Sequence, residues 1–264
     1  MGFEIDLLPV GSEKKSGDCI VIRCGDLYKG GYAQDLIVID GGYKDSWAST
    51  IKPHLLKYSN CNIDGRIHIN LAVLSHTDQD HVGGLVEMAK DKDVVIDNIM
   101  MHRPWYELTS SWFKDGRITK DSLKGKLGDV FEKAKELDDI CKSNHVKECS
   151  FDPGTYTLDR DIKISILGPD ADFYKTCIAS CEKTPDADDS VDELSQAQSN
   201  NGALFLEEYN PGNIKWDNTE NTSPVNESSI ILLVEYDGIK VLLTGDAGKE
   251  ALRRAIKFAA DNYI

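Results

Sequence analysis

Short apolar runs separated by turn-forming residues divide the N-terminal part of the chain into alternating strands and helices. Strands are expected where β-branched and other apolar residues cluster, at Phe3–Pro9, Asp18–Cys24, Asp35–Asp40, Ile67–Leu74 and Val94–Met101. Helical spacing of apolar residues occurs instead in Ser46–Lys57 and in Gly83–Lys90. The near-continuous apolar run of Ile67–Leu74 is typical of a strand that is buried on both faces.

The second half of the chain continues this alternation. A long helical stretch is expected at Thr119–Ser143, broken or frayed near Gly125 and Gly128. Paired strands are expected at Thr155–Leu158 and Ile162–Leu167, because both segments are short and rich in β-formers.

The clearest hairpin signal lies near the C-terminus. Ser228–Tyr236 and Ile239–Leu243 flank an Asp-Gly pair that suits a two-residue type I′ turn. An amphipathic helix at Lys249–Ala260 follows. Since strands outnumber helices and hairpins are frequent, the pattern predicts an α/β fold whose sheets are covered by helices.

Composition fits one globular domain over residues 1–264 that carries an acidic insertion. Hydrophobic residues make up 41% and charged residues 28% of the chain, a balance that can bury a substantial core. The net charge of -15 argues against a protein that coats nucleic acid or an anionic membrane by bulk attraction. Much of the excess acid lies at about 181–225, a polar segment expected to be a partly disordered surface insertion.

The chain shows no sign of export or of membrane insertion. No apolar run approaches the roughly 20 residues that cross a bilayer. The first residues include Glu4 and Asp6 but no basic residue, unlike a signal peptide. Seven cysteines occur without a CxxC pair, so neither a disulfide framework nor a zinc knuckle is expected. These features predict a cytoplasmic protein.

One segment concentrates metal-binding residue types. His76, Asp78, Asp80 and His81 follow a predicted buried strand and precede Gly83-Gly84. Carboxylates and neutral imidazoles are ligands for divalent metals, and clustered carboxylates at a strand end repel each other unless a cation neutralises them. The alternative is a polar loop in which one of these side chains caps the following helix.

Two further carboxylates follow predicted strands. Asp246 comes after the apolar run that ends in Gly245, and Asp40 precedes Gly41-Gly42. Each is ambiguous alone, because Asp246 could cap the next helix and Asp40 could stabilise a turn.

The ordered motifs of the chain resemble the metallo-β-lactamase superfamily. The segment His76-x-Asp78-x-Asp80-His81-x-Gly83-Gly84 is similar to the family's metal signature, His-x-His-x-Asp-His, with Asp78 in place of the second His. That departure is itself typical of the branch that includes the soluble domain of the DNA-uptake protein ComEC. Further matches follow in the order of that branch, from about Phe3 to Ala247: Gly17-Asp18, Asp40-Gly41-Gly42, Leu167-Gly168-Pro169, Asn226-x-Ser228-Ser229 and Leu242-Leu243-Thr244-Gly245-Asp246.

The resemblance implies an αβ/βα four-layer sandwich with a metal site at one sheet edge. In that arrangement His76 and Asp78 hold one ion, and Asp80 and His81 hold the other. Asp246 bridges the two ions.

The resemblance assigns supporting roles as well. Asn226 stands where many members of the superfamily carry another His ligand, so it is expected to bind metal weakly or to contact substrate. Asp40 is expected to support the ligands, and Asp80 is the expected catalytic residue. It would orient the attacking hydroxide or move its proton.

The implied function is a metal-dependent hydrolase that uses a metal-bound hydroxide, with a phosphodiester of nucleic acid or of a nucleotide as substrate. One or two ions of Zn²⁺ or Mn²⁺ are the expected cofactors. Because Asp78 is a harder ligand than imidazole, Mg²⁺ and Mn²⁺ should compete better here than at an all-His site.

One departure from the family concerns the C-terminus. There the chain continues into a strand that carries a further His ligand, whereas this sequence ends at Ile264. The domain is therefore expected to lack its last strand, and either a partner subunit, a missing C-terminal segment or fewer ligands would explain this. Two other functions stay open: a weakly active or inactive metal-binding and recognition domain of a larger assembly, and hydrolysis of a small thioester, lactone or lactam.

Overall fold

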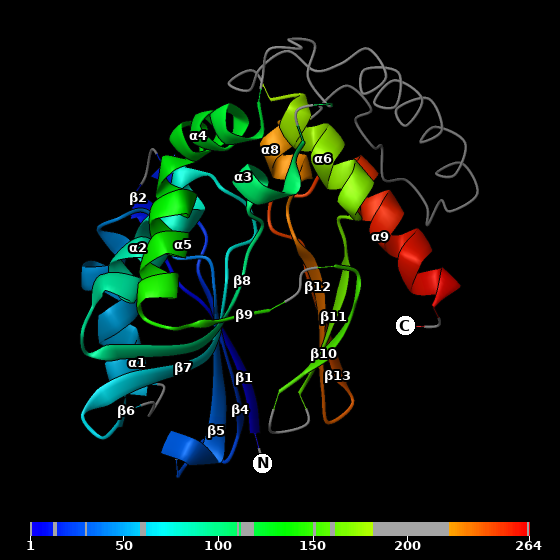
Figure 1. Ribbon diagram of the computed structural model, residues 1–264. Coiled ribbons are helices and arrows are strands. Elements are labelled where there is room, and N and C mark those ends of the chain that lie inside the picture. The colour runs from blue at the N-terminus through cyan, green and yellow to red at the C-terminus, as the bar shows by residue number, and fades with distance from the viewer. Residues whose placement is uncertain are drawn as a thin grey trace. The chain divides into compact units, whose positions relative to one another are not determined.

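The computed structural model describes most of the chain as a mixed α/β structure, as the sequence predicts (Figure 1). The described residues are 2–12, 15–29, 31–58, 62–109, 111, 119–149, 152–158, 162–181, 222–262 and 264. Most of the predicted acidic insertion, 182–221, lies outside them.

The chain forms two compact units built from interleaved segments. The first unit comprises Met1–His102, Phe131–Ile166 and Leu232–Leu243. The second unit comprises Arg103–Val130, Leu167–Ile231 and Thr244–Ile264. The single-domain organisation expected from the sequence stays a prediction.

A mixed sheet forms the centre of the first unit, with strand order β1-β4-β5-β7-β8-β9 and with β6 paired to β7. Its strands are β1 (Gly2–Leu7), β4 (Ile20–Gly25), β5 (Gln34–Ile39), β6 (Asn62–Ile63), β7 (Arg66–Val73), β8 (Val94–Met100) and β9 (Lys147–Glu148). The pairs from β5 through β9 along this path are parallel, and those of β1 with β4 and β4 with β5 are antiparallel. All of β5 is buried, including the polar Gln34 and Asp35 at its start. The carboxyl ends of β5, β7 and β8 consequently meet at one sheet edge.

Helices cover this sheet, and a small hairpin adjoins it in sequence. The helical segments are η1 (Gly31–Ala33), η2 (Trp47–Ile51), α1 (Lys52–Tyr58), α2 (Gln79–Lys90) and α5 (Glu132–Ser143), and the hairpin is β2 (Gly11–Ser12) with β3 (Lys15–Ser16). Helices α2 and α5 lie side by side (Figure 1). Lys90 Nζ lies 2.7 Å from Glu136 Oε1, and Asn144 Nδ2 donates to the Ala89 carbonyl at 3.1 Å. Pro53 is the second residue of α1, which continues directly from η2, whose hydrogen bonding is of the π type.

A second, four-stranded sheet has the order β10-β11-β12-β13. It consists of β10 (Gly154–Thr157), β11 (Lys163–Gly168), β12 (Ile231–Tyr236) and β13 (Ile239–Leu243). The predicted hairpin is confirmed, since Asp237 and Gly238 have φ angles of 49° and 80° between β12 and β13. The first strand of the hairpin begins at Ile231 rather than at Ser228, because a one-turn helix precedes it.

The second unit is helical where it is described. Its helices are α3 (Pro104–Glu107), α4 (Lys120–Val130), α6 (Ala171–Ala179), α8 (Pro224–Glu227) and α9 (Lys249–Asp261). Helix α8 contacts both α6 and α9. None of the helices in the described ranges is both long and apolar enough to cross a membrane.

Two expected helix boundaries are wrong. The break in the long helical stretch falls at Phe131, between α4 and α5, and not at Gly125 or Gly128. Helix α2 begins at Gln79 instead of Gly83. The glycine pair therefore lies inside α2, and tertiary contacts override its low helix propensity.

Those tertiary contacts form a backbone seam between α2 and the turn after β5. Gly41 N–H donates to the His81 carbonyl at 2.7 Å, and Gly84 N–H donates to the Gly42 carbonyl at 3.0 Å. A Cβ atom on Gly84 would overlap the Gly41 carbonyl oxygen, and one on Gly41 would overlap the Leu85 amide nitrogen. Only glycine therefore permits this approach.

Asp91, at the end of α2, accepts hydrogen bonds from side chains of η2 and α1. Its carboxylate accepts from Lys52 Nζ at 2.8 Å and from Trp47 Nε1 at 3.0 Å. Burial alone would raise the pKa of Asp91, but the hydrogen bonds from Lys52 and from the Asp93 amide, with that from Trp47, bring its pKa below the usual range.

Substituting Gly84 tests the seam. Gly84→Ala should lower the free energy of unfolding by about 1–3 kcal/mol through overpacking. Gly125→Ala is the matched control, because Gly125 lies in α4 with nothing within 4 Å of its would-be Cβ, and it should gain up to about 1 kcal/mol from helix propensity. Urea unfolding of both variants measures the difference. A Gly84→Ala protein as stable as the Gly125→Ala protein would contradict the seam.

The Asp91 cluster predicts an acid-sensitive contribution to stability. Because the folded-state pKa is lowered, the contribution is present above the ordinary Asp pKa and is lost as the pH falls below about 4 toward the folded-state value. Asp91→Asn should cost about 1 kcal/mol at pH 7 and flatten the pH dependence of the unfolding free energy between about pH 5 and 3. Equal slopes for the variant and the parent protein would contradict this assignment.

Candidate metal centre

Parallel strands bring the candidate residues to one edge of the mixed sheet. Asp40 follows β5, and Ser75 and His76 follow β7. The Asp40 N–H donates to the Val73 carbonyl at 2.8 Å, which continues the β5–β7 pairing beyond the strand ends. Asp40 has a left-handed φ of 57°, a conformation that Asp adopts more readily than most residues.

The side chain of Asp40 is buried and accepts three hydrogen bonds. It is 2% exposed, and its Oδ1 accepts the Ser75 N–H at 2.8 Å. Its Oδ2 accepts the Ser75 hydroxyl at 2.6 Å and lies 2.9 Å from His81 Nδ1. Three hydrogen bonds compensate the cost of burying the carboxylate.

The two imidazoles of the cluster lie against each other. His76 and His81 are 3% and 2% exposed, and their ring centroids are 4.0 Å apart. Because a carboxylate only accepts, the contact with Asp40 requires a proton on His81 Nδ1, and in the neutral ring the lone pair is then on Nε2. His81 is thus held in the tautomer that metal-binding histidines use when Nδ1 contacts a carboxylate.

Asp78 lies beside His76 and does not act as a helix cap. It occupies the position before the first residue of α2, yet its side chain makes no capping hydrogen bond. Its Oδ2 lies 3.7 Å from His76 Nε2. Two ligands of one ion, each bound at about 2.0–2.2 Å, lie about 3 to 3.6 Å apart, so a small adjustment would let both groups bind one cation.

Asp80 lies in the first turn of α2, next to the segment before β4. Its backbone carbonyl accepts the Asp18 N–H at 3.2 Å. In the described part of the chain its carboxylate makes no hydrogen bond to either imidazole. Burial raises the pKa of the Tyr43 phenol, and the negative charge of Asp80 raises it further.

Asn226 and Asp246 form a pair in the second unit. Asn226 Nδ2 donates to Asp246 Oδ2 at 3.4 Å, and the Ser223 hydroxyl donates to Asn226 Oδ1 at 2.8 Å. The amide oxygen is therefore occupied by Ser223, and the amide nitrogen faces the carboxylate. In this orientation Asn226 positions Asp246, and its expected contact with metal or substrate stays a prediction.

Asp246 does not cap α9, contrary to the simplest alternative for it. The cap position belongs to Gly248, which has no side chain to serve as a cap. The carboxylate of Glu227 supplies the missing acceptor, since Ala251 N–H donates to Glu227 Oε2 at 3.0 Å. Burial raises the pKa of Glu227. The N-terminus of α9 is therefore capped by Glu227 and not by Asp246.

The structure thus brings together part of the predicted set in each unit. His76, Asp78, His81 and Asp40 lie together in the first unit. Asn226 and Asp246 pair in the second, and the joining of Asp246 to the histidines stays a prediction. Sequence reasoning missed Ser75, whose only signal is a hydroxyl residue between a buried strand and the first histidine of the cluster.

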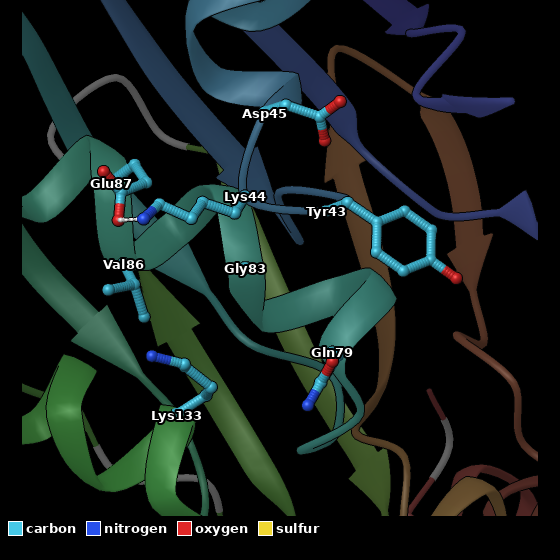
Figure 2. Close-up of a pocket in the computed structure, with 8 residues that line it drawn as sticks. All are labelled: Tyr43, Lys44, Asp45, Gln79, Gly83, Val86, Glu87 and Lys133. Atoms are coloured by element: carbon cyan, nitrogen blue, oxygen red, sulfur yellow. Dashed lines mark ion pairs between the residues drawn. The ribbon is translucent and has the colours of Figure 1, made fainter.

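A pocket of about 210 Å³ borders α2 (Figure 2). It is lined by Tyr43, Lys44, Asp45, Gln79, Gly83, Val86, Glu87 and Lys133. Gln79 and Gly83 share a helix face with Val86, whereas His81 lies about 200° around the helix from Gln79. Figure 2 also shows the ion pair of Lys44 with Glu87, whose atoms are 3.9 Å apart. The pocket is thus separate from the histidine pair, and its lysines are partly neutralised.

Comparison with known proteins adds no family assignment. No protein-family model matches the chain, and no curated protein matches it. The chemical interpretation therefore depends on the donor set: two buried imidazoles, one of them oriented by a buried carboxylate, and a further carboxylate next to the other.

Proposed function

We propose that this protein is a metal-dependent hydrolase that acts on a phosphodiester of nucleic acid or of a nucleotide. The observation that carries the proposal is the buried imidazole pair, with Asp40 accepting from Nδ1 of His81. Buried ionisable groups that gather at the carboxyl ends of parallel strands are frequent at functional sites, which supports the proposal.

The donor set suits one or two divalent cations. His76 and Asp78 would hold one ion, Asp80 and His81 the other, and Asp246 would bridge them. Imidazole nitrogen with carboxylate oxygen suits Zn²⁺ and Mn²⁺, and the high share of carboxylates lets Mg²⁺ compete. A bound cation would also offset the repulsion between Asp78 and Asp80.

The bound cations would supply Lewis-acid activation of water and of the scissile bond. The chain's own residues have distinct tasks in the proposed reaction. Asp40 holds His81 in place, and Asn226 orients Asp246. Asp80, which makes no hydrogen bond to the imidazoles, would accept the proton of the attacking water. An anionic phosphodiester would be drawn to the cations in spite of the negative net charge of the chain.

The proposed architecture is the αβ/βα four-layer sandwich of the metallo-β-lactamase superfamily, in the branch with ComEC-like domains. The mixed sheet and the antiparallel sheet are compatible with its two central layers. The ring of Phe3 on β1 stacks on that of Tyr236 on β12, with centroids 5.8 Å apart, so residues of the two sheets touch within the first unit.

Metal binding and turnover can be measured on the purified protein with Mn²⁺ and Zn²⁺ and the generic substrate bis(p-nitrophenyl) phosphate. We expect one or two equivalents of bound metal, and His81→Ala should weaken binding at least about 100-fold. Asp80→Asn should lower turnover by about 10²–10⁴-fold. His145→Asn is the control, because His145 is exposed, lies far along the chain and has a left-handed φ of 57° that Asn tolerates.

Three outcomes would separate the functional alternatives. Absence of stoichiometric metal would reject the proposal. Stoichiometric metal without turnover would favour a recognition domain, and undiminished phosphodiester hydrolysis by Asp80→Asn would exclude the role of Asp80. Parallel assays with a thioester, a lactone and a β-lactam would detect the remaining hydrolase classes.

A further inference from the structure

We infer that Ser75 is a positioning residue, and that Ser75 and Asp40 together determine the tautomers of His76 and His81. Both tautomers depend on hydrogen bonds that lead to one oxygen, Asp40 Oδ2. The consequence for metal affinity rests on the proposed function. The proton arrangement itself does not, because it follows from hydrogen bonds within the protein.

The tautomer of His76 follows from counting protons at Ser75. A serine hydroxyl has one proton, and Ser75 donates it to Asp40 Oδ2 at 2.6 Å. The Ser75 oxygen also lies 3.1 Å from His76 Nδ1. Because the only hydroxyl proton of Ser75 is used in the hydrogen bond to Asp40, the Ser75 oxygen can only accept from His76. His76 Nδ1 therefore carries a hydrogen. The lone pair of the His76 ring is then on Nε2.

The same carboxylate oxygen determines the tautomer of His81. Asp40 Oδ2 accepts from Nδ1 of His81 at 2.9 Å, which leaves the second lone pair on Nε2. The carboxylate cannot turn freely, since Oδ1 is held by the Ser75 N–H at 2.8 Å. Ser75 and Asp40 are each 2% exposed, so water cannot readily substitute for either partner. Two ligand nitrogens therefore depend on one buried oxygen.

This arrangement makes an isosteric substitution informative. In Asp40→Asn the amide oxygen must face the Ser75 N–H, so the NH₂ group takes the place of Oδ2. That group would donate to Ser75 Oγ and to His81 Nδ1. The Ser75 hydroxyl would then turn to donate to His76 Nδ1. All four hydrogen bonds survive: the one from the Ser75 N–H keeps its direction, the other three are reversed, and both imidazoles carry their proton on Nε2.

Asp40→Asn should therefore keep the fold and lose the metal ligands. We expect urea unfolding close to that of the parent protein and Zn²⁺ and Mn²⁺ affinities about 100-fold weaker, the upper end for losses of residues that orient metal ligands. Ser75→Ala should release only His76 and weaken affinity by about 10-fold. Ser75→Thr retains the hydroxyl and should keep an affinity closer to that of the parent protein than Ser75→Ala does.

The direct readout is the tautomer of each histidine in the metal-free protein. Long-range ¹H–¹⁵N NMR of histidine-labelled protein, at a pH where imidazoles are neutral, distinguishes a protonated from an unprotonated ring nitrogen. We expect Nδ1–H at His76 and His81 in the parent protein and Nε2–H at both in Asp40→Asn. Ser165→Ala is the matched control, because Ser165 is 0% exposed and its hydroxyl makes no hydrogen bond to described residues.

The outcomes separate this inference from the proposed function. Nδ1–H at both rings that is unchanged in Asp40→Asn would overturn the inference, even if the protein binds metal. A His76 signal that does not respond to Ser75→Ala would overturn the role of Ser75. Tautomers that switch as expected in a protein that binds no metal would support the inference and reject the proposed function.

Discussion

The buried carboxylate of Asp40 is the interaction on which the candidate site depends. It joins the end of β5 to the end of β7 through Ser75, and it joins both to the first turn of α2 through His81. An uncompensated buried carboxylate would be strongly destabilising. The three donors therefore stabilise the buried Asp40 carboxylate, and Asp40 in turn fixes their orientation.

The glycine seam makes this network possible. The pairs Gly41-Gly42 and Gly83-Gly84 let the turn after β5 touch the backbone of α2. A side chain at Gly41 or Gly84 would push α2 outward and carry His81 away from Asp40. The seam and the Asp40 carboxylate thus act together. The backbone contacts set the distance between α2 and the turn after β5, and the hydrogen bonds of Asp40 set the orientation of the His81 ring.

Local sequence patterns predict most of the strands and most of the residues proposed to bind metal, because both follow from short-range rules. The run Ile67–Leu74 and the cluster behind it are visible without a structure. The start of α2 at Gln79 is not, since the seam with Gly41 overrides the propensity of its glycines. The roles of Ser75 and Asn226 also depend on hydrogen-bond direction. Such direction is a property of tertiary structure that no residue pattern encodes.

X-ray absorption spectroscopy of the zinc-loaded protein tests the central claim most directly, since it reports the ligands of the ion itself. The account predicts imidazole scattering from two nitrogens at about 2.0–2.1 Å, together with carboxylate oxygens at about 2.0–2.2 Å. In Asp40→Asn this imidazole signature should be lost. A zinc shell without imidazole in the parent protein, or one unchanged in Asp40→Asn, would contradict the account.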